Sequence, residues 1–213
     1  MKFEKLNDWP SDKTIKRLIY IGFVVLWINF PIIIYLGELS HYPATFLESQ
    51  LSFSGAVIKS HFKGMTAEQL HYYRLYQLSD DVYDFCQITM FCSLSLFLAR
   101  KFDEDSAWRK TGFKMAIIGL IGTICDLIEN SLLIMMTFDP QGFPDSWAIA
   151  HSCLATFKFT LWGIQAVWIV WAGIKLFKKD IITKKTFLAA IGVLASQQWP
   201  TPFVALALAL GIY

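Results

Sequence analysis

Three apolar segments of the chain carry polar and ionisable side chains at the spacing of one helix face. In the first, Tyr73, Gln77, Asp80, Asp84 and Gln87 follow one another at intervals of four, three, four and three residues. Such intervals place side chains on a single stripe of an α-helix. This stripe would present two carboxylates, two amides and a phenol to its surroundings.

Two further segments carry ionisable groups in the same way. Asp126, Glu129 and Asn130 occupy adjacent turns of one face, while His151 and Lys158 lie seven residues apart, or two turns, on another segment. Carboxylates paired in a dry site can be driven to opposite protonation states and so divide the acid and base roles between them. The pattern therefore predicts proton-transfer chemistry.

The helical rise places these groups at similar depths. Counted from the outer ends of their segments, Glu129 lies roughly 13 Å, Lys158 roughly 15 Å and Asn29 roughly 11 Å into a membrane, with Asp84 about one turn in. These separate stripes are expected to converge in the outer half of a bundle. Because one lysine cannot neutralise three carboxylates, at least one acid is expected to keep its proton.

The sequence thus predicts a polar cavity within the membrane, lined by two sets of residues. The predicted catalytic residues are Asp84, Asp126, Glu129 and Lys158. The predicted ligand-binding residues are Tyr73, Gln77, Asp80, Gln87, Asn130, His151 and Asn29. Plainer alternatives stay open: Lys158 could form a structural ion pair, Asp80 could be an interfacial charge, and Asn29 could join two spans by a polar contact.

Composition indicates what must position these residues. The chain has 213 residues, of which 55% are hydrophobic and 17% charged, against about 25% charged in ordinary soluble domains. This composition predicts an all-α, polytopic transmembrane helical bundle. The formal net charge of +2 lacks the basic excess of nucleic-acid-binding proteins, so no nucleic-acid partner is expected.

Five stretches are long and apolar enough to cross a bilayer as helices. They cover residues 18–36, 82–99, 114–138, 148–176 and 187–213, with 1–17 as an N-terminal segment, 37–81 as an outer segment, and 18–213 as one membrane domain. Pro200 and Pro202 interrupt the fifth stretch, which is therefore a kinked span or a re-entrant hairpin, the kinked span being favoured.

The basic residues predict the orientation of these spans. Fifteen Lys and Arg residues lie before the first span, between the second and third, and after the fourth, when Lys114 and Lys175 at the span edges are included, whereas the outer segment carries three, Lys59, Lys63 and Arg74. The loop 139–147 carries none. We therefore expect a cytoplasmic N-terminus and a multi-pass protein of the plasma membrane.

The outer segment contains one clear helix start. Thr66 followed by Gln69 forms a capping-box pattern, and neither Gly nor Pro occurs between Ala67 and Ala99. This predicts one helix that begins outside the membrane and continues into the second span. The stretch 51–55 fits either a short strand or the start of an interfacial helix.

Cysteine and metal chemistry receive little support. The four cysteines form no CxxC or zinc spacing and fall within predicted spans, so neither a disulfide framework nor a zinc site is expected. Carboxylates with one imidazole could suit iron or manganese, but the Glu-x-x-His pair of carboxylate di-iron bundles does not occur. No metal site is predicted, and the sequence identifies no cofactor and no oligomeric state.

The motif Asp126-Leu127-Ile128-Glu129-Asn130, together with the acidic segment 69–100, resembles a loose group of small prokaryotic polytopic membrane proteins. Their layout is a first span, an outer segment of some forty residues, an acidic second span and a third span with an Asp-x-x-Glu-Asn motif. The resemblance covers residues 18–176 and implies a fold without an established activity. In layout alone, the chain is also similar to the emopamil-binding and sigma-2-receptor-like family, which binds sterol-like molecules in an acidic cavity.

Three functions fit these patterns. In the first, the protein binds or chemically transforms a small lipid-like molecule by proton transfer, with membrane lipid as the implied partner. In the second, the same carboxylates carry the coupling proton of a transporter, although no inverted repeat is evident. In the third, the polar stripes only specify helix packing in a structural or assembly protein.

Overall fold

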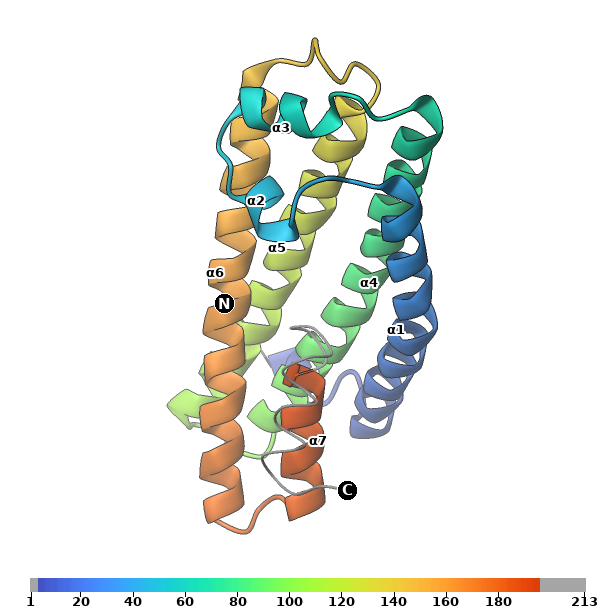
Figure 1. The fold of residues 1–213 in the computed structure, drawn as a ribbon. Coiled ribbons are helices and arrows are strands. Elements are labelled where there is room, and N and C mark those ends of the chain that lie inside the picture. Colours follow the sequence, from blue (N-terminus) through green and yellow to red (C-terminus); the bar gives the residue numbers. More distant parts are fainter. Residues whose placement is uncertain (1–3, 196–213) are drawn as a thin grey trace. The chain divides into compact units, whose positions relative to one another are not determined.

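The computed structural model describes residues 4–195, and this part of the chain is helical without strands (Figure 1). A short 3-10 helix, η1 (Glu4–Asn7), precedes seven α-helices. These are α1 (Asp12–Ser40), α2 (Phe46–Gln50), α3 (Gly55–Phe62), α4 (Ala67–Ala99), α5 (Ala107–Met136), α6 (Asp145–Lys178) and α7 (Lys184–Ala195).

Four of these helices, α1, α4, α5 and α6, are long and apolar enough to cross a membrane. They correspond to the first four predicted spans, but each begins before its predicted apolar stretch, and α5 ends two residues before the predicted end at 138. With 29 residues in α1 and 34 in α6, they reach roughly 44 and 51 Å at the usual helical rise. The helices are therefore longer than a hydrocarbon core of about 30 Å is thick, and they carry polar turns at their ends.

The predicted fifth span is described only in part. Its start lies in α7, a helix of 12 residues, and residues 196–213, which include both prolines of the interrupted stretch, lie outside the described residues. Whether this stretch spans or re-enters thus stays a prediction.

The chain forms two compact units, and each unit takes one portion of the long helices. The first contains the described residues up to Phe23, those of 87–119 and those from Gly163 on. The second contains Val24–Cys86 and Leu120–Trp162. In the first unit, Arg100 at the end of α4 donates to the carbonyls of Leu6 and Pro10 and pairs with Asp12 at 3.1 Å. These bonds hold the N-terminal segment against the turn between α4 and α5.

The outer segment packs in the second unit, where α3 lies beside the adjoining ends of α5 and α6 (Figure 1). The Ser54 side chain caps α3 by accepting from the Val57 amide, so the stretch 51–55 leads into a helix rather than a strand. Lys59 of α3 pairs with Asp145 at 2.7 Å. The buried apolar core beneath it comprises Ile58, Phe62, Tyr73, Leu133, Met136, Phe143 and Ala148.

The continuous helix from the outer segment into the second span is confirmed. α4 runs unbroken over 33 residues from Ala67. The Thr66 amide donates to the Gln69 side chain at 2.8 Å, and the Gln69 amide donates to the Thr66 hydroxyl at 3.2 Å. These reciprocal bonds are the predicted capping box, and they fix where α4 begins.

Candidate functional site

A buried group of charged side chains joins α5 to α6 in the second unit. The Lys158 ammonium contacts the Asp126 carboxylate and lies 2.7 Å from Oε2 of Glu129. Oε1 of Glu129 lies 3.5 Å from Nε2 of His151. Since Asp126 and Glu129 lie one turn apart on α5, a single lysine from α6 reaches both acids.

These four side chains are sealed from solvent, with exposed fractions of 0% for Glu129 and His151, 1% for Lys158 and 3% for Asp126. A buried charge is tolerated only when it is paired and hydrogen-bonded. Lys158 supplies that partner for both acids. Neither ring nitrogen of His151 has a hydrogen-bond partner among the described residues, and the same holds for Oε1 of Glu129.

The acids of α4 face the same group. Asn130 of α5 donates to Oδ1 of Asp81 at 3.0 Å and to Oδ2 of Asp80 at 3.3 Å. Asp84, one turn further along α4, is 1% exposed and lies close enough to Asp126 for the two charges to interact. Neither of its carboxylate oxygens has a hydrogen-bond partner within the described part of the chain. With Asp80, Asp126 and Glu129, Asp84 gives four acids around one lysine.

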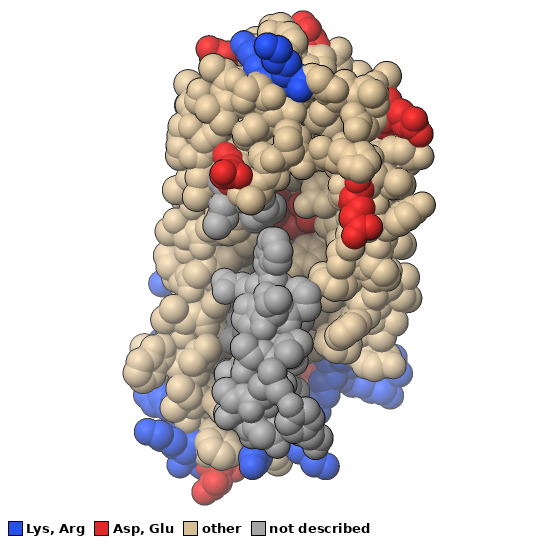
Figure 2. All heavy atoms as spheres, viewed as in Figure 1, with Lys and Arg blue, Asp and Glu red and all other residues tan. Residues whose placement is uncertain are grey.

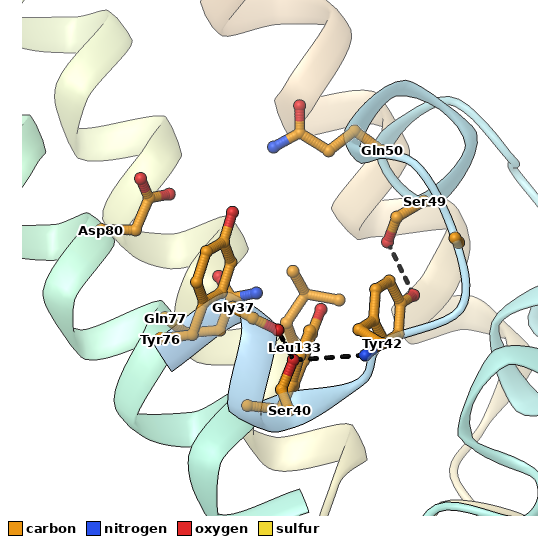
Figure 3. Close-up of a pocket in the computed structure, with 11 residues that line it drawn as sticks. Gly37, Ser40, Tyr42, Ser49, Gln50, Tyr76, Gln77, Asp80 and Leu133 are labelled. Carbon is orange, nitrogen blue, oxygen red and sulfur yellow. Dashed lines mark hydrogen bonds between the residues drawn. The ribbon is translucent and has the colours of Figure 1, made fainter. Parts of the chain in front are cut away.

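A cavity of about 160 Å³ opens beside this charged group (Figure 3). It lies among the ends of α1, α2, α4 and α5. Its lining comprises Gly37, Ser40, Tyr42, Ala44, Ser49, Gln50, Tyr73, Tyr76, Gln77, Asp80 and Leu133. Figure 2 shows a hollow in the molecular surface with acidic atoms visible inside it.

Three tyrosines form an aromatic wall of the cavity. The ring centroids of Tyr42 and Tyr73 lie 4.5 Å apart, and those of Tyr73 and Tyr76 lie 6.1 Å apart in a stacked arrangement. The Tyr42 hydroxyl forms hydrogen bonds with Ser49 Oγ at 3.0 Å and with His61 Nδ1 at 3.1 Å. Burial raises the pKa of Tyr42 to about 12, so this hydroxyl keeps its proton at neutral pH.

The structure brings most of the sequence-predicted site residues together but divides them between two places. The predicted catalytic residues Asp84, Asp126, Glu129 and Lys158 form or adjoin the charged group, and none of them lines the cavity. His151 and Asn130 belong to that group as well. The cavity itself is lined by Tyr73, Gln77 and Asp80 from the predicted ligand-binding set. Asp80 alone belongs to both places, since it lines the cavity and accepts from Asn130.

Two predicted ligand-binding residues lie elsewhere. The Asn29 amide donates to the Ser79 carbonyl at 2.8 Å and accepts from the Ser79 hydroxyl at 2.8 Å. This closed pair joins α1 to α4 and occupies both ends of the Asn29 side chain. Gln87 is buried in the first unit.

Sequence reasoning missed eight lining residues of the cavity, among them four with polar side chains, Tyr42, Ser49, Gln50 and Tyr76. Tyr76 could have been found, because it lies three residues after Tyr73 and four before Asp80, on the edge of the predicted stripe. The other three lie in the non-periodic outer segment, where spacing gives no indication of which side chains turn inward. No cluster of three or more His, Cys, Asp or Glu suited to a metal ion occurs among the described residues.

Comparisons with models of protein families, with curated proteins and with solved structures give no match to this chain. The resemblance to small prokaryotic membrane proteins therefore stays a prediction, and the site must be interpreted from its own geometry.

Proposed function

We propose that this chain is an integral membrane protein whose cavity binds the polar head of a small lipid-like molecule and exchanges a proton with it. One observation carries the proposal: Asp80 lines the cavity, and it also lies close enough to Asp126 and Lys158 of the adjoining group for their charges to interact. A head bound in the cavity would lie next to carboxyl groups that can hold protons.

The charged group suits proton transfer. Four buried or half-buried acids, Asp80, Asp84, Asp126 and Glu129, share the positive charge of Lys158. Two like charges close together in a low dielectric do not both ionise, so protons are retained within the group. An acid that holds its proton can donate it to a bound head, and another acid of the group, such as Glu129, can take up the replacement.

The topology that we propose has five spans, with the N-terminus in the cytoplasm and the cavity in the outer half of the bundle. Its support is the distribution of charge. Fifteen Lys and Arg residues lie before the first predicted span, between the second and third, and after the fourth, with those at the span edges included, against three in the outer segment. Cytoplasmic segments carry such an excess in membrane proteins, and the plasma membrane is the proposed location.

A structural role is the second candidate, and the contact between Lys158 and Asp126 favours it. In this role, the tight and buried ion pair serves to specify how α5 packs against α6 and has no other function. Under this alternative the cavity would bind nothing, and the acids would matter for folding alone.

Native mass spectrometry of the purified protein separates the two candidates. We expect a retained lipid-like molecule on the wild type and on Ala150→Trp, which changes an exposed position of α6. Ala44→Trp fills the cavity with an indole and should remove that molecule while the protein stays folded. Equal retention by both variants, or none on the wild type, would favour the structural role.

Glu129→Gln and Asp126→Leu test the proton-transfer step. Glu129→Gln keeps the shape and one acceptor, so the fold and the bound molecule should persist while proton uptake on binding, measured by calorimetry in two buffers, changes. Asp126→Leu removes the nearest partner of Lys158 and should damage both folding and binding. Equal losses of folding from both substitutions would point to packing instead.

A further inference from the structure

The chemistry of the cavity lining also indicates which kind of head it takes. Among the described residues that line it, Asp80 is the only carboxylate, and none is Lys, Arg or His. The neighbouring group adds three further acids, Asp84, Asp126 and Glu129, against one lysine. An anionic head would therefore be repelled, and a positively charged head would be attracted.

Two acceptor groups of the cavity lining are placed to hold such a head. Oδ2 of Asp80 accepts the hydrogen bond from Asn130 at 3.3 Å, and the carboxylate carries a second oxygen. Gln50 lies across the cavity from Asp80 (Figure 3), and it is 3% exposed. Its Oε1 has no hydrogen-bond partner among the described residues. Both groups are acceptors, so a positively charged donor would match them.

The tyrosine wall suits the same charge. The faces of aromatic rings attract a cation that comes within about 6 Å, and the attraction grows where water is excluded. Tyr73 is 2% exposed and is packed between Tyr42 and Tyr76. A cation would therefore lie against Tyr42 or Tyr76, and a neutral hydroxyl head would gain nothing comparable from these rings.

The size and position of the cavity restrict the rest of the ligand. A volume of about 160 Å³ matches a benzene-sized group and is well below the space that most whole ligands occupy. Gly37 and Ser40 lie at the last turn of α1, and Leu133 lies three residues before the end of α5. The cavity thus lies at the level of the helix ends. A head bound there would leave the apolar part of an amphiphile in the membrane.

We infer that the head bound by this cavity is a protonated amine, held by Asp80 and the tyrosine wall, so that the ligand is an alkylammonium amphiphile. This inference rests on the proposed function, because it names the ligand class of the same cavity. It needs no covalent step, and the proton exchanged with the acids is the one carried by the ammonium nitrogen.

The test uses three radiolabelled probes with one chain length: tetradecylamine, tetradecanol and tetradecanoate. Saturable binding to the full-length protein is measured in dodecyl maltoside micelles, which carry no charge. The amine should bind at least about tenfold more tightly than the alcohol, and the carboxylate should not bind saturably. Asp80→Asn should reduce amine affinity about tenfold or more without changing that of the alcohol.

Asp81→Asn is the matched control, since Asp81 is the adjacent acid on α4, accepts from the same Asn130 and does not line the cavity. It should leave the preference for the amine intact. Equal binding of amine and alcohol by the wild type would overturn the inference about the head while leaving the cavity proposal in place, and this comparison requires no variant to fold. The absence of saturable binding for every probe, or binding that survives Ala44→Trp, would instead overturn the proposed function itself.

Discussion

The ammonium nitrogen of Lys158 lies 2.7 Å from Oε2 of Glu129, and both side chains are closed to solvent. The same nitrogen contacts Asp126, so one lysine from α6 holds two acids of α5. The mutual attraction of such a group offsets the desolvation of each charge only while that charge keeps a partner of opposite sign. Removing the lysine alone should therefore lower the stability of the protein, whereas removing the acids as well should restore much of it.

Lys158→Met should destabilise the protein by about 3–5 kcal/mol, because it leaves two acids without a buried counter-charge. Adding Asp126→Leu and Glu129→Gln to that variant should recover much of the loss, since the two acids in direct contact with Lys158 then no longer leave unpaired carboxylates. Free energies of unfolding in mixed micelles would measure both effects. Lys63→Met, at an exposed position after α3, is the control and should change stability little. A triple variant no more stable than Lys158→Met alone would contradict this account.

Much of the charged group could be predicted from the sequence, because its residues follow helix periodicity. Asp126 and Glu129 repeat at three residues, and His151 and Lys158 repeat at seven. Long helices in a membrane must turn such groups inward, so spacing and rise alone predicted their convergence. The capping box at Thr66 likewise fixed the start of α4 from local chemistry.

The cavity could not be predicted in the same way. Ser49 and Gln50 enter its wall from a five-residue helix, and Tyr42 enters from a turn, so no periodic pattern indicates their direction. Asn29 shows the opposite difficulty. Its depth matched that of the acids, but depth does not specify a partner, and the Ser79 hydroxyl and carbonyl occupy its amide.

Two glycines of the α5 and α6 helices should respond in opposite directions to the same substitution. A Cβ atom at Gly122 would lie 2.6 Å from Nε1 of Trp162, too close for an ordinary contact. Gly122→Ala should therefore cost about 1–3 kcal/mol of stability through overpacking. It should also disturb Lys158, whose ammonium lies 5.8 Å from the centre of the Trp162 ring.

Gly163→Ala is the matched control, because a Cβ atom there would meet nothing within 4 Å. Replacing glycine by alanine in an open helix position should raise stability by about 0.5–1 kcal/mol. Unfolding of the two variants under identical conditions measures the difference. If Gly122→Ala were as stable as Gly163→Ala, the result would contradict the close packing of α5 against Trp162.

The outer segment should loosen as the pH falls, because of His61. Burial lowers the pKa of His61 below its ordinary value of 6.5, against a smaller opposing effect of the Glu48 charge. The neutral ring is thus favoured when folded, and the contribution to stability is present above pH 6.5. It is lost progressively as the pH falls from 6.5 through the lower folded-state pKa, because the unfolded segment binds the proton more readily.

Hydrogen exchange of the α2 and α3 amides would detect this loosening between pH 7 and pH 5. Glu48 should not account for it, because hydrogen bonds from the Thr45 amide and hydroxyl lower the pKa of Glu48 from its ordinary value of 4.5, below that window. His61→Gln keeps a partner for the Tyr42 hydroxyl without titrating, so its exchange should be independent of pH after correction for the intrinsic rate. An unchanged pH dependence in that variant would assign the effect to another group.

The last prediction concerns the sides of the membrane. Ser60 lies in α3, Asp105 lies in the turn between α4 and α5, and α4 alone separates them as a membrane-length helix. We therefore expect the two positions to face opposite sides, and the basic residues around Asp105 predict that it faces the cytoplasm. In a protein whose four native cysteines are replaced by alanine, a membrane-impermeant thiol reagent added to intact cells should label Ser60→Cys. It should label Asp105→Cys and Asp180→Cys, which follows α6, only after the membrane is permeabilised. Labelling of Asp105→Cys in intact cells without labelling of Ser60→Cys would reverse the topology and move the cavity to the inner half of the bundle.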